Sequence, residues 1–182
     1  MTQAQEQQAQ HYCLFETALG TCGVAWSEHG LTRVNLPERD RAAIERRLQA
    51  GKRSSAEPPA VVRNVIAALQ RYMAGTPVAF DDVLIDWTGV DDFRRDVYDA
   101  ARKVGWGETV TYGELAKRAG YDGQAQEVGQ AMARNPVPVV MPCHRVLASG
   151  GKLGGFSAYG GTLTKERLLI LEGVGSPRLP GL

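Results

Sequence analysis

The chain has 182 residues, of which 43% are hydrophobic and 23% charged, and its formal net charge is +1. This composition is typical of a globular protein, and the length allows one large domain or two small ones. No apolar run approaches the length of a membrane span and no charged-then-apolar leader opens the sequence. These features argue against a membrane protein and predict a cytoplasmic one. A monomer is the default expectation.

Residues 1–90 are predicted to form an N-terminal α/β domain. Turns at Gly20 and at His29-Gly30 separate three strand-like segments, which predict an antiparallel meander over residues 11–17, 23–27 and 31–36. Cys13 and Cys22 lie in this apolar region, where a free cysteine usually acts as a small buried hydrophobic residue. The third cysteine, Cys143, makes the number odd, so the cysteines cannot all pair within the chain.

The rest of this domain is predicted to contain two helices and one more strand. Apolar residues at helical intervals predict helices over residues 39–50 and 61–73. Residues 79–85 are apolar around a central acidic pair and predict a closing strand. Residues 51–59 are expected to form a loop, and residues 86–91 a linker.

Residues 91–182 are predicted to form a mostly helical C-terminal domain, which makes the whole chain an α/β (α+β) protein. An apolar stripe predicts a helix that starts at Asp92 and stops before Gly105. Thr111 and Glu114 have the spacing of a capping box, which predicts the start of the next helix. A short turn then leads to a helix over residues 124–134, which ends at an Asn-Pro pair.

The last two of these helices have the pattern of a helix-turn-helix motif, in which the second helix reads DNA. Most helix pairs bind nothing, and the small residues Gly129, Ala131 and Ala133 on the second helix are equally suited to packing against a neighbouring helix. Charge is unevenly distributed, however. Residues 100–182 hold ten Lys and Arg against six Asp and Glu, whereas residues 1–90 hold nine against ten. The local excess favours phosphate contacts without proving them.

The most informative segment is residues 140–146, Val-Met-Pro-Cys-His-Arg-Val. It places a cysteine beside a histidine after an apolar stretch. A thiol is a weak nucleophile until it loses its proton, and a neighbouring imidazole is a common acceptor for that proton. A Cys-His pair alone is a weak signal, but an Asn-Pro pair lies eight residues upstream and a glycine-rich loop follows.

This longer pattern resembles the O6-alkylguanine-DNA alkyltransferases, also called methylated-DNA-protein-cysteine methyltransferases. The resemblance covers about residues 93–173, roughly half of the chain. Its core is Asn135-Pro136, the Pro-Cys-His-Arg-Val block, Gly160-Gly161 and residues 165–172, and residues 107–116 also fit. The resemblance implies transfer of an alkyl group from guanine oxygen to cysteine sulfur, once per molecule and without a cofactor. The implied partner is double-stranded DNA that contains alkylated bases.

The resemblance also implies roles for five residues. Cys143 would be the nucleophile, ionised within an apolar cavity, and His144 its base, acting through water. Glu172 would orient the imidazole and balance its charge, as in other catalytic triads. Asn135 would brace the loop before the nucleophile, although an asparagine before proline is also a common helix stop. Tyr112 would donate its hydroxyl to the guanine, although it also suits a helix-capping region.

The resemblance further implies an alkyl pocket and a recognition helix that enters the minor groove. The residues expected to line or rim the pocket are Met141, Val146, Phe156, Ser157 and Tyr159. The residues expected to meet DNA are Gln126, Gly129, Ala131 and Arg134.

Three features depart from the family pattern. Gln126 stands where family members place an arginine that fills the space left by the flipped base, and Glu127 beside it would repel phosphate. The loop over residues 154–161 is two residues longer than usual, with Phe156 at the position of a tyrosine. Ser27 stands where some members have a cysteine that binds structural zinc, so we expect no metal.

These departures leave alternatives open. The same chemistry on bulkier or unusual lesions is one, because the altered loop forms a rim of the pocket. A non-catalytic reader of alkylated DNA is another, although such relatives replace the reactive cysteine, which is present here. A Cys-His hydrolase is more distant, because nothing in the sequence indicates a dedicated oxyanion site.

Overall fold

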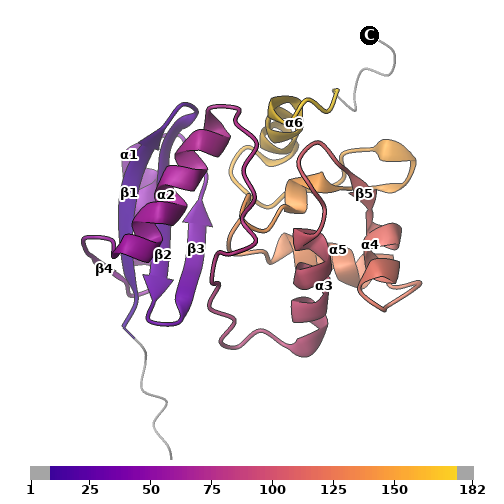
Figure 1. The fold of residues 1–182 in the computed structure, drawn as a ribbon, viewed down its shortest axis with the longest axis horizontal. Helices are drawn as coiled ribbons and strands as arrows, with labels where there is room; N and C mark the ends of the chain where they lie inside the picture. The colour runs from indigo at the N-terminus through magenta and orange to yellow at the C-terminus, as the bar shows by residue number, and fades with distance from the viewer. Residues whose placement is uncertain (1–8, 176–182) are drawn as a thin grey trace, which may run out of the picture.

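The structure, a computed structural model, describes residues 9–175. Its N-terminal half contains a four-stranded sheet in the order β3-β2-β1-β4 (Figure 1). The antiparallel meander predicted from the sequence is confirmed: β1 pairs with β2 and β2 with β3, both antiparallel. The bounds of its strands are β1 (His11–Thr17), β2 (Gly20–Ser27) and β3 (Gly30–Asn35).

The fourth strand is not the one predicted. Residues 79–85 form no strand; a turn at Asp81-Asp82 interrupts them, and only Ile85 makes an isolated bridge to Leu31. Phe80 and Ile85 are nevertheless buried, so their apolar character reflects side-chain packing rather than a ladder of backbone hydrogen bonds. The actual edge strand is β4 (Ser54–Ser55), which lies in the predicted loop and pairs with β1 in parallel.

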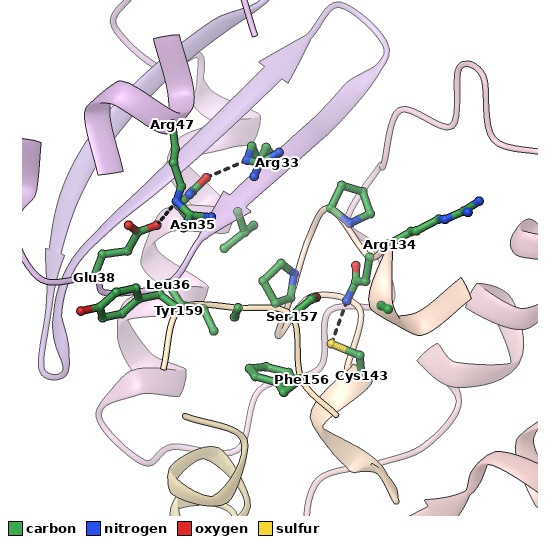
Figure 2. A pocket seen from close by; sticks show the side chains of 16 residues that line it. Arg33, Asn35, Leu36, Glu38, Arg47, Arg134, Cys143, Phe156, Ser157 and Tyr159 are labelled. Atoms are coloured by element: carbon green, nitrogen blue, oxygen red, sulfur yellow. Dashed lines mark hydrogen bonds and ion pairs between the residues drawn. The ribbon is translucent and has the colours of Figure 1, made fainter. Parts of the chain in front are cut away.

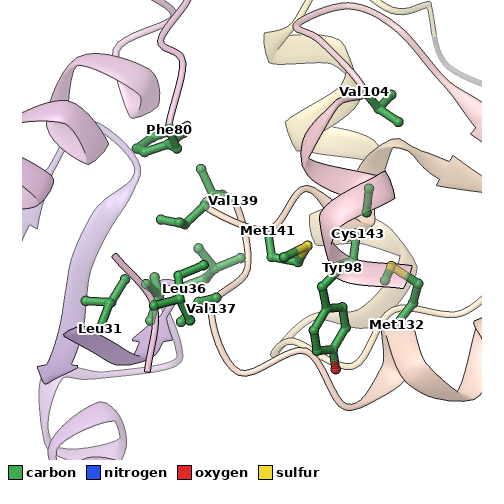
Figure 3. Packing of buried hydrophobic residues seen from close by; sticks show 14 of the residues in the cluster. Leu31, Leu36, Phe80, Tyr98, Val104, Met132, Val137, Val139, Met141 and Cys143 are labelled. Carbon is green, nitrogen blue, oxygen red and sulfur yellow. The ribbon is translucent and has the colours of Figure 1, made fainter. Parts of the chain in front are cut away.

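Alternate residues of the strands face opposite sides of the sheet, and each side carries one helix. Tyr12 and Ala25 pack with Ile44 and Leu48 of α1 (Arg41–Gln49). The opposite face packs with α2 (Ala60–Met73) and continues into the C-terminal half. Figure 3 shows this continuous core, in which Leu31 and Leu36 of the N-terminal half approach Val137 and Val139 of the segment before the cysteine. The segment before Cys143 is thus packed on the N-terminal sheet.

The C-terminal half is mostly helical, as predicted. Its helices are α3 (Asp92–Arg102), α4 (Tyr112–Arg118), α5 (Ala125–Ala133) and α6 (Gly161–Leu171). The predicted capping box is present: the Thr111 hydroxyl accepts from the Glu114 N–H at 3.2 Å, and the Glu114 carboxylate accepts from the Thr111 N–H at 2.7 Å.

The helix-turn-helix consists of α4 and α5, which pack against each other and against α3. A small two-stranded parallel sheet joins β5 (Val110–Thr111), just before α4, to β6 (Val146–Leu147), just after Cys143-His144-Arg145. Two short 3-10 helices, η1 (Cys143–Arg145) and η2 (Ser149–Gly151), complete the described elements. None of the helices described within residues 9–175 is long and apolar enough to cross a membrane.

Candidate active site

Cys143 opens η1, directly after a tight turn of the backbone. In this turn the Met141 N–H donates to the Val137 carbonyl at 2.8 Å, and Val139 has a φ of 75°. A β-branched residue rarely adopts a positive φ, so the surrounding packing must hold the turn in place. Val137, Val139 and Met141 are all buried, which supplies that packing. The sulfur is therefore presented from a rigid segment.

Asn135 connects the turn to Cys143 through hydrogen bonds. Its side-chain amide donates to the Met141 carbonyl at 2.8 Å and to the Cys143 sulfur at 3.1 Å. Its carbonyl oxygen accepts from the Val137 N–H at 2.9 Å. The dashed line at the Cys143 sulfur in Figure 2 marks the hydrogen bond from the Asn135 amide. Asn135 thus lies where a residue that braces this loop would have to lie.

The environment of Cys143 favours the neutral thiol at rest. Burial raises the pKa of Cys143, while the hydrogen bond from Asn135 and the positive charge of Lys165 act in the opposite direction. This result differs from the expectation of an ionised sulfur, because burial outweighs the groups that favour the anion. Attack by this sulfur therefore requires a base.

His144 and Glu172 lie together in the interior. His144 Nε2 is 2.6 Å from Glu172 Oε1, and both side chains are inaccessible to solvent. A carboxylate can only accept, so the imidazole proton lies on Nε2. The other ring nitrogen, Nδ1, is buried and has no hydrogen-bond partner among residues 9–175. The lone pair of Nδ1 is therefore available to a proton.

Charge in this interior group is balanced by Arg145. Its guanidinium donates to both oxygens of Glu172, from Nε at 2.9 Å and from Nη2 at 2.9 Å, and its Nη1 donates to the Val104 carbonyl at 2.5 Å. Burial alone would raise the pKa of Glu172, but hydrogen bonds from His144, Arg145 and Tyr72 outweigh it and hold the pKa at about 2.

The imidazole of His144 is neutral at neutral pH. Burial lowers the pKa of His144 and outweighs the neighbouring Glu172, which raises it. A neutral histidine with a free Nδ1 lone pair is suited to act as a general base.

A pocket of about 390 Å³ opens on the sulfur from the side of α5. Its walls are predominantly apolar, and its volume lies in the range of small-molecule sites, about 300–1,000 Å³. The residues that line it are Tyr112, Gly129, Met132, Ala133, Cys143, Gly155, Phe156 and Ser157. The structure therefore brings Tyr112, Phe156 and Ser157 together with the nucleophile.

The other predicted pocket residues lie elsewhere. Met141 and Val146 are completely buried and are absent from the lining of the pocket, because they face the core behind the cysteine. Tyr159 is 46% exposed and lies on a second cavity of about 240 Å³, on the side of the N-terminal sheet. Figure 2 shows this cavity, where Tyr159 lies near Leu36 and Glu38.

The four predicted DNA-contacting residues do not share one surface. Gln126 and Arg134 are exposed, at the first turn and at the C-cap of α5, and Gly129 lines the pocket beside the Tyr112 ring. Ala131 is buried, and its carbonyl accepts from the Tyr98 hydroxyl at 2.9 Å. Ala131 therefore packs α5 against α3 and cannot meet DNA through its side chain.

The position expected for a zinc ligand holds a hydrogen bond instead. The Ser27 hydroxyl donates to Asp86 at 2.5 Å. Within residues 9–175 no group of three or more His, Cys, Asp or Glu side chains is placed to hold a metal ion. Hydroxyl and carboxylate groups do not fit the Cys-rich pattern of a structural zinc site. The absence of zinc stays a prediction.

Two buried residues at the site were not singled out from the sequence. Tyr72, on α2, donates to Glu172 at 2.6 Å. Lys165, on α6, donates to the Val146 and Gly155 carbonyls and lies 5.7 Å from the centre of the Tyr112 ring. The only signal for Tyr72 was a tyrosine on the apolar side of a predicted helix, and such residues are usually core. Lys165 lies within residues 165–172, which match the family pattern, but the resemblance assigns it no role.

Comparison with known proteins agrees with this arrangement. The family model of "6-O-methylguanine DNA methyltransferase, ribonuclease-like domain" matches residues 10–87, and that of the DNA binding domain of the same family matches residues 92–174. A methylated-DNA--protein-cysteine methyltransferase of Methanothermobacter thermautotrophicus is 35% identical over 154 residues, which span 84% of this chain and 79% of the relative. A protein of the same name from Mycobacterium tuberculosis is 32% identical over 160 residues, 88% and 90% of the two chains.

Solved structures extend the similarity to three dimensions. The crystal structure of M. tuberculosis O6-methylguanine methyltransferase superposes with a TM-score of 0.72 at 31% identity, and covers 95% of this chain and 96% of that one. The M. tuberculosis OGT protein in complex with DNA gives a TM-score of 0.70 at 32% identity, over 89% and 92% of the chains. Both halves of the chain and the surroundings of its buried cysteine therefore agree with one assignment, and the chain belongs to the 6-O-methylguanine DNA methyltransferase family.

Proposed function

We propose that this protein repairs DNA directly, by irreversible transfer of a methyl group from O6-methylguanine to Cys143, once per molecule. The observation that carries the proposal is the position of the Cys143 sulfur. It lies in a mainly apolar pocket beneath α5 and next to a buried, neutral histidine. Relatives at 32–35% identity carry the name of this activity.

In the proposed step, sulfur attacks the methyl carbon of the lesion. The new S–C bond forms as the C–O6 bond breaks, and the electrons of that bond go to the guanine. The thiol proton passes through a water molecule to Nδ1 of His144, whose positive charge is then balanced by Glu172. The Tyr112 hydroxyl, at the wall of the pocket, donates a proton to the departing base, which leaves as neutral guanine, and the proton taken up by His144 then returns through water to the Tyr112 phenolate. The thioether is stable, so no second turnover follows.

No cofactor enters this proposal, because the chain supplies the nucleophile, the base and the proton donor. We further propose that the protein acts as a monomer in the cytoplasm, on double-stranded DNA. Its α5 would lie in the minor groove, with Gln126 and Arg134 on the exposed side of the helix. The flipped base would enter between α5 and the loop that holds Phe156 and Ser157.

A bulkier lesion is the second candidate substrate. Two cavities reach Cys143, one of about 390 Å³ and one of about 240 Å³, and the loop through Phe156 and Ser157 lines both of them. Movement of this glycine-rich loop would join the two volumes and accommodate a larger adduct.

Incubation of the protein with a duplex oligonucleotide that contains O6-methylguanine, followed by intact-protein mass spectrometry, tests the proposal. We expect the mass of one methyl group on every reactive molecule. Binding without a gain in mass would instead indicate a reader of alkylated DNA. Reaction only with a larger O6 adduct would favour the second candidate.

Gln126→Arg is expected to accelerate repair in duplex DNA several-fold. An arginine adds charge and a planar surface for the space left by the flipped base, whose extrusion costs a few kcal/mol. Reaction with free O6-benzylguanine, which needs no flipping, should change little. Gln130→Arg, at another position of the same helix, adds the same charge as a control. Equal acceleration by both variants, or on both substrates, would rule out a flipping role for position 126.

Gly154→Ala is expected to slow transfer about tenfold, since small displacements of reacting groups have large effects on rate. Gly154 has a φ of +67°, and a Cβ there would lie 3.3 Å from the Tyr112 ring and 3.5 Å from its hydroxyl. Gly151→Ala is the matched control, because Gly151 has a φ of +74° and a Cβ there would meet no atom within 4 Å. The single-turnover rate of Gly154→Ala should be lower than that of Gly151→Ala. Similar rates in the two variants would mean that backbone strain, and not contact with Tyr112, causes the loss of activity.

A further inference from the structure

Tyr72 belongs to the N-terminal half of the chain, yet its hydroxyl lies in the interior group around His144. The hydroxyl donates to Glu172 Oε1 at 2.6 Å and lies 3.1 Å from His144 Nε2. It is separated from these residues by 100 and 72 positions in the sequence. The side chain is 0% exposed, so water does not compete for these contacts.

The phenol ring is held in place by aromatic neighbours. Trp106 of the C-terminal half meets it edge-on, with ring centres 5.3 Å apart and an interplanar angle of 76°. Phe80 lies at 6.0 Å and the His144 ring at 6.3 Å. Burial, with Glu172 adding to its effect, raises the pKa of Tyr72, so the hydroxyl keeps its proton and remains a donor. A ring packed on several sides leaves the hydroxyl little freedom to turn away.

The Tyr72 hydroxyl shares Glu172 Oε1 with two other hydrogen-bond donors. This oxygen accepts from Tyr72, His144 and Arg145 at 2.6, 2.6 and 2.9 Å. Each donor withdraws negative charge from the oxygen that faces the imidazole. The Tyr72 hydroxyl therefore weakens the pull of the carboxylate on the Nε2 proton, and it fixes the direction from which that pull acts.

We propose that Tyr72 is a positioning residue for alkyl transfer, through which the N-terminal half of the chain sets the orientation and the basicity of His144. This inference rests on the proposed function, since it assigns His144 the role of base. It also gives the N-terminal half a direct part in the reaction, beyond packing against the loop of the nucleophile.

The direction of the effect follows from the groups around the imidazole. The titratable or charged groups that face His144 are Cys143 and Arg145 of η1, Tyr72 of α2, Lys165 of α6 and Glu172 at its C-cap. Removal of the Tyr72 hydroxyl leaves more negative charge on Glu172, which stabilises the imidazolium and raises the pKa of His144. Because only the neutral imidazole can accept the thiol proton, the acid limb of the pH–rate profile should move to higher pH.

Tyr72→Phe keeps the ring and removes the hydroxyl. We expect its single-turnover rate on free O6-benzylguanine and on methylated duplex to fall about tenfold at neutral pH, with the acid limb shifted upward. Tyr12→Phe is the matched control: Tyr12 is also buried and donates to a glutamate, Glu45, at 3.2 Å, but it lies on the far side of the sheet. Its rate and profile should match those of the wild type.

Loss of stability alone would lower the folded fraction without moving the acid limb. Incorporation of 3-fluorotyrosine at position 72 provides a second test, because it retains the ring and makes the hydroxyl a stronger donor. The acid limb should then move to lower pH, opposite to Tyr72→Phe. If the wild type takes up alkyl groups and neither change at position 72 moves the acid limb, the inference about Tyr72 is wrong and the proposed function stands. If the wild type takes up none, the proposed function itself fails.

Discussion

Replacing Cys143 by alanine is expected to abolish alkyl uptake completely. In the proposed reaction the sulfur forms the new bond, and no other group that lines the pocket can form a stable thioether. Intact-protein mass spectrometry after prolonged incubation with O6-methylguanine duplex should show no added methyl group. The variant should still fold and bind DNA, because the change removes one small buried side chain.

The other cysteines provide the control. Burial raises the pKa of Cys22 to about 12 and that of Cys13 to about 11, and neither residue lines the pocket that holds Cys143, so neither is expected to react. Cys22→Ala should take up one methyl group, as the wild type does. Methyl uptake by Cys143→Ala would show that a different residue is the acceptor, and peptide mapping would locate it.

Glu172→Gln is expected to cause the second large loss, in both activity and stability. Arg145 donates to both oxygens of Glu172, so the NH2 group of the amide faces either Arg145 alone or both Arg145 and Nε2 of His144. Both orientations lose the negative charge that balances the imidazolium, and the second also favours the histidine tautomer with the proton on Nδ1, which cannot accept the thiol proton. Replacing the carboxylate of a catalytic triad by an amide lowers rates on the order of 1,000-fold or more. Single-turnover kinetics on free O6-benzylguanine measures the effect without a contribution from DNA binding.

The same substitution leaves the buried Arg145 without its counter-ion. Loss of one partner of a buried ion pair costs about 3–5 kcal/mol of folding free energy. The depressed pKa of Glu172 indicates a contribution to folding free energy of similar size, because a fall in pKa from 4.5 to about 2 corresponds to about 3 kcal/mol. Urea denaturation at neutral pH, compared with the wild type, measures this loss.

The pH dependence of stability provides a sharper measurement. Because folding lowers the pKa of Glu172, its contribution is fully present above the unfolded value of 4.5 and is lost as pH falls through about 2. The difference in unfolding free energy between wild type and Glu172→Gln should therefore shrink between these two pH values. Glu45→Gln, which changes the glutamate beside Tyr12, should leave alkyl transfer intact. A constant difference across that pH range would show that Glu172 is not the group responsible.

Much of this protein could be inferred from local sequence. The meander, the helices and the capping box follow from patterns a few residues long, in which side-chain spacing and backbone hydrogen bonding decide the structure together. The proposed nucleophile and base were also evident, because Cys143 and His144 are adjacent and occur in a motif specific to one family. The prediction of a strand over residues 79–85 was wrong, because an apolar segment can be either a strand or a loop whose side chains pack in the core.

The contacts that determine reactivity were decided only by the tertiary structure. Tyr72 meets His144 and Glu172 across 72 and 100 residues, and neither spacing has a local periodicity that a sequence could reveal. Local sequence also did not reveal the environments of Met141 and Ala131. Both are apolar and lie near Cys143 in the sequence, but they face the core rather than the pocket or DNA. Burial depends on which surfaces the folded chain brings together. Local sequence therefore specified the proposed reacting groups, while long-range packing set their protonation and their access to the pocket.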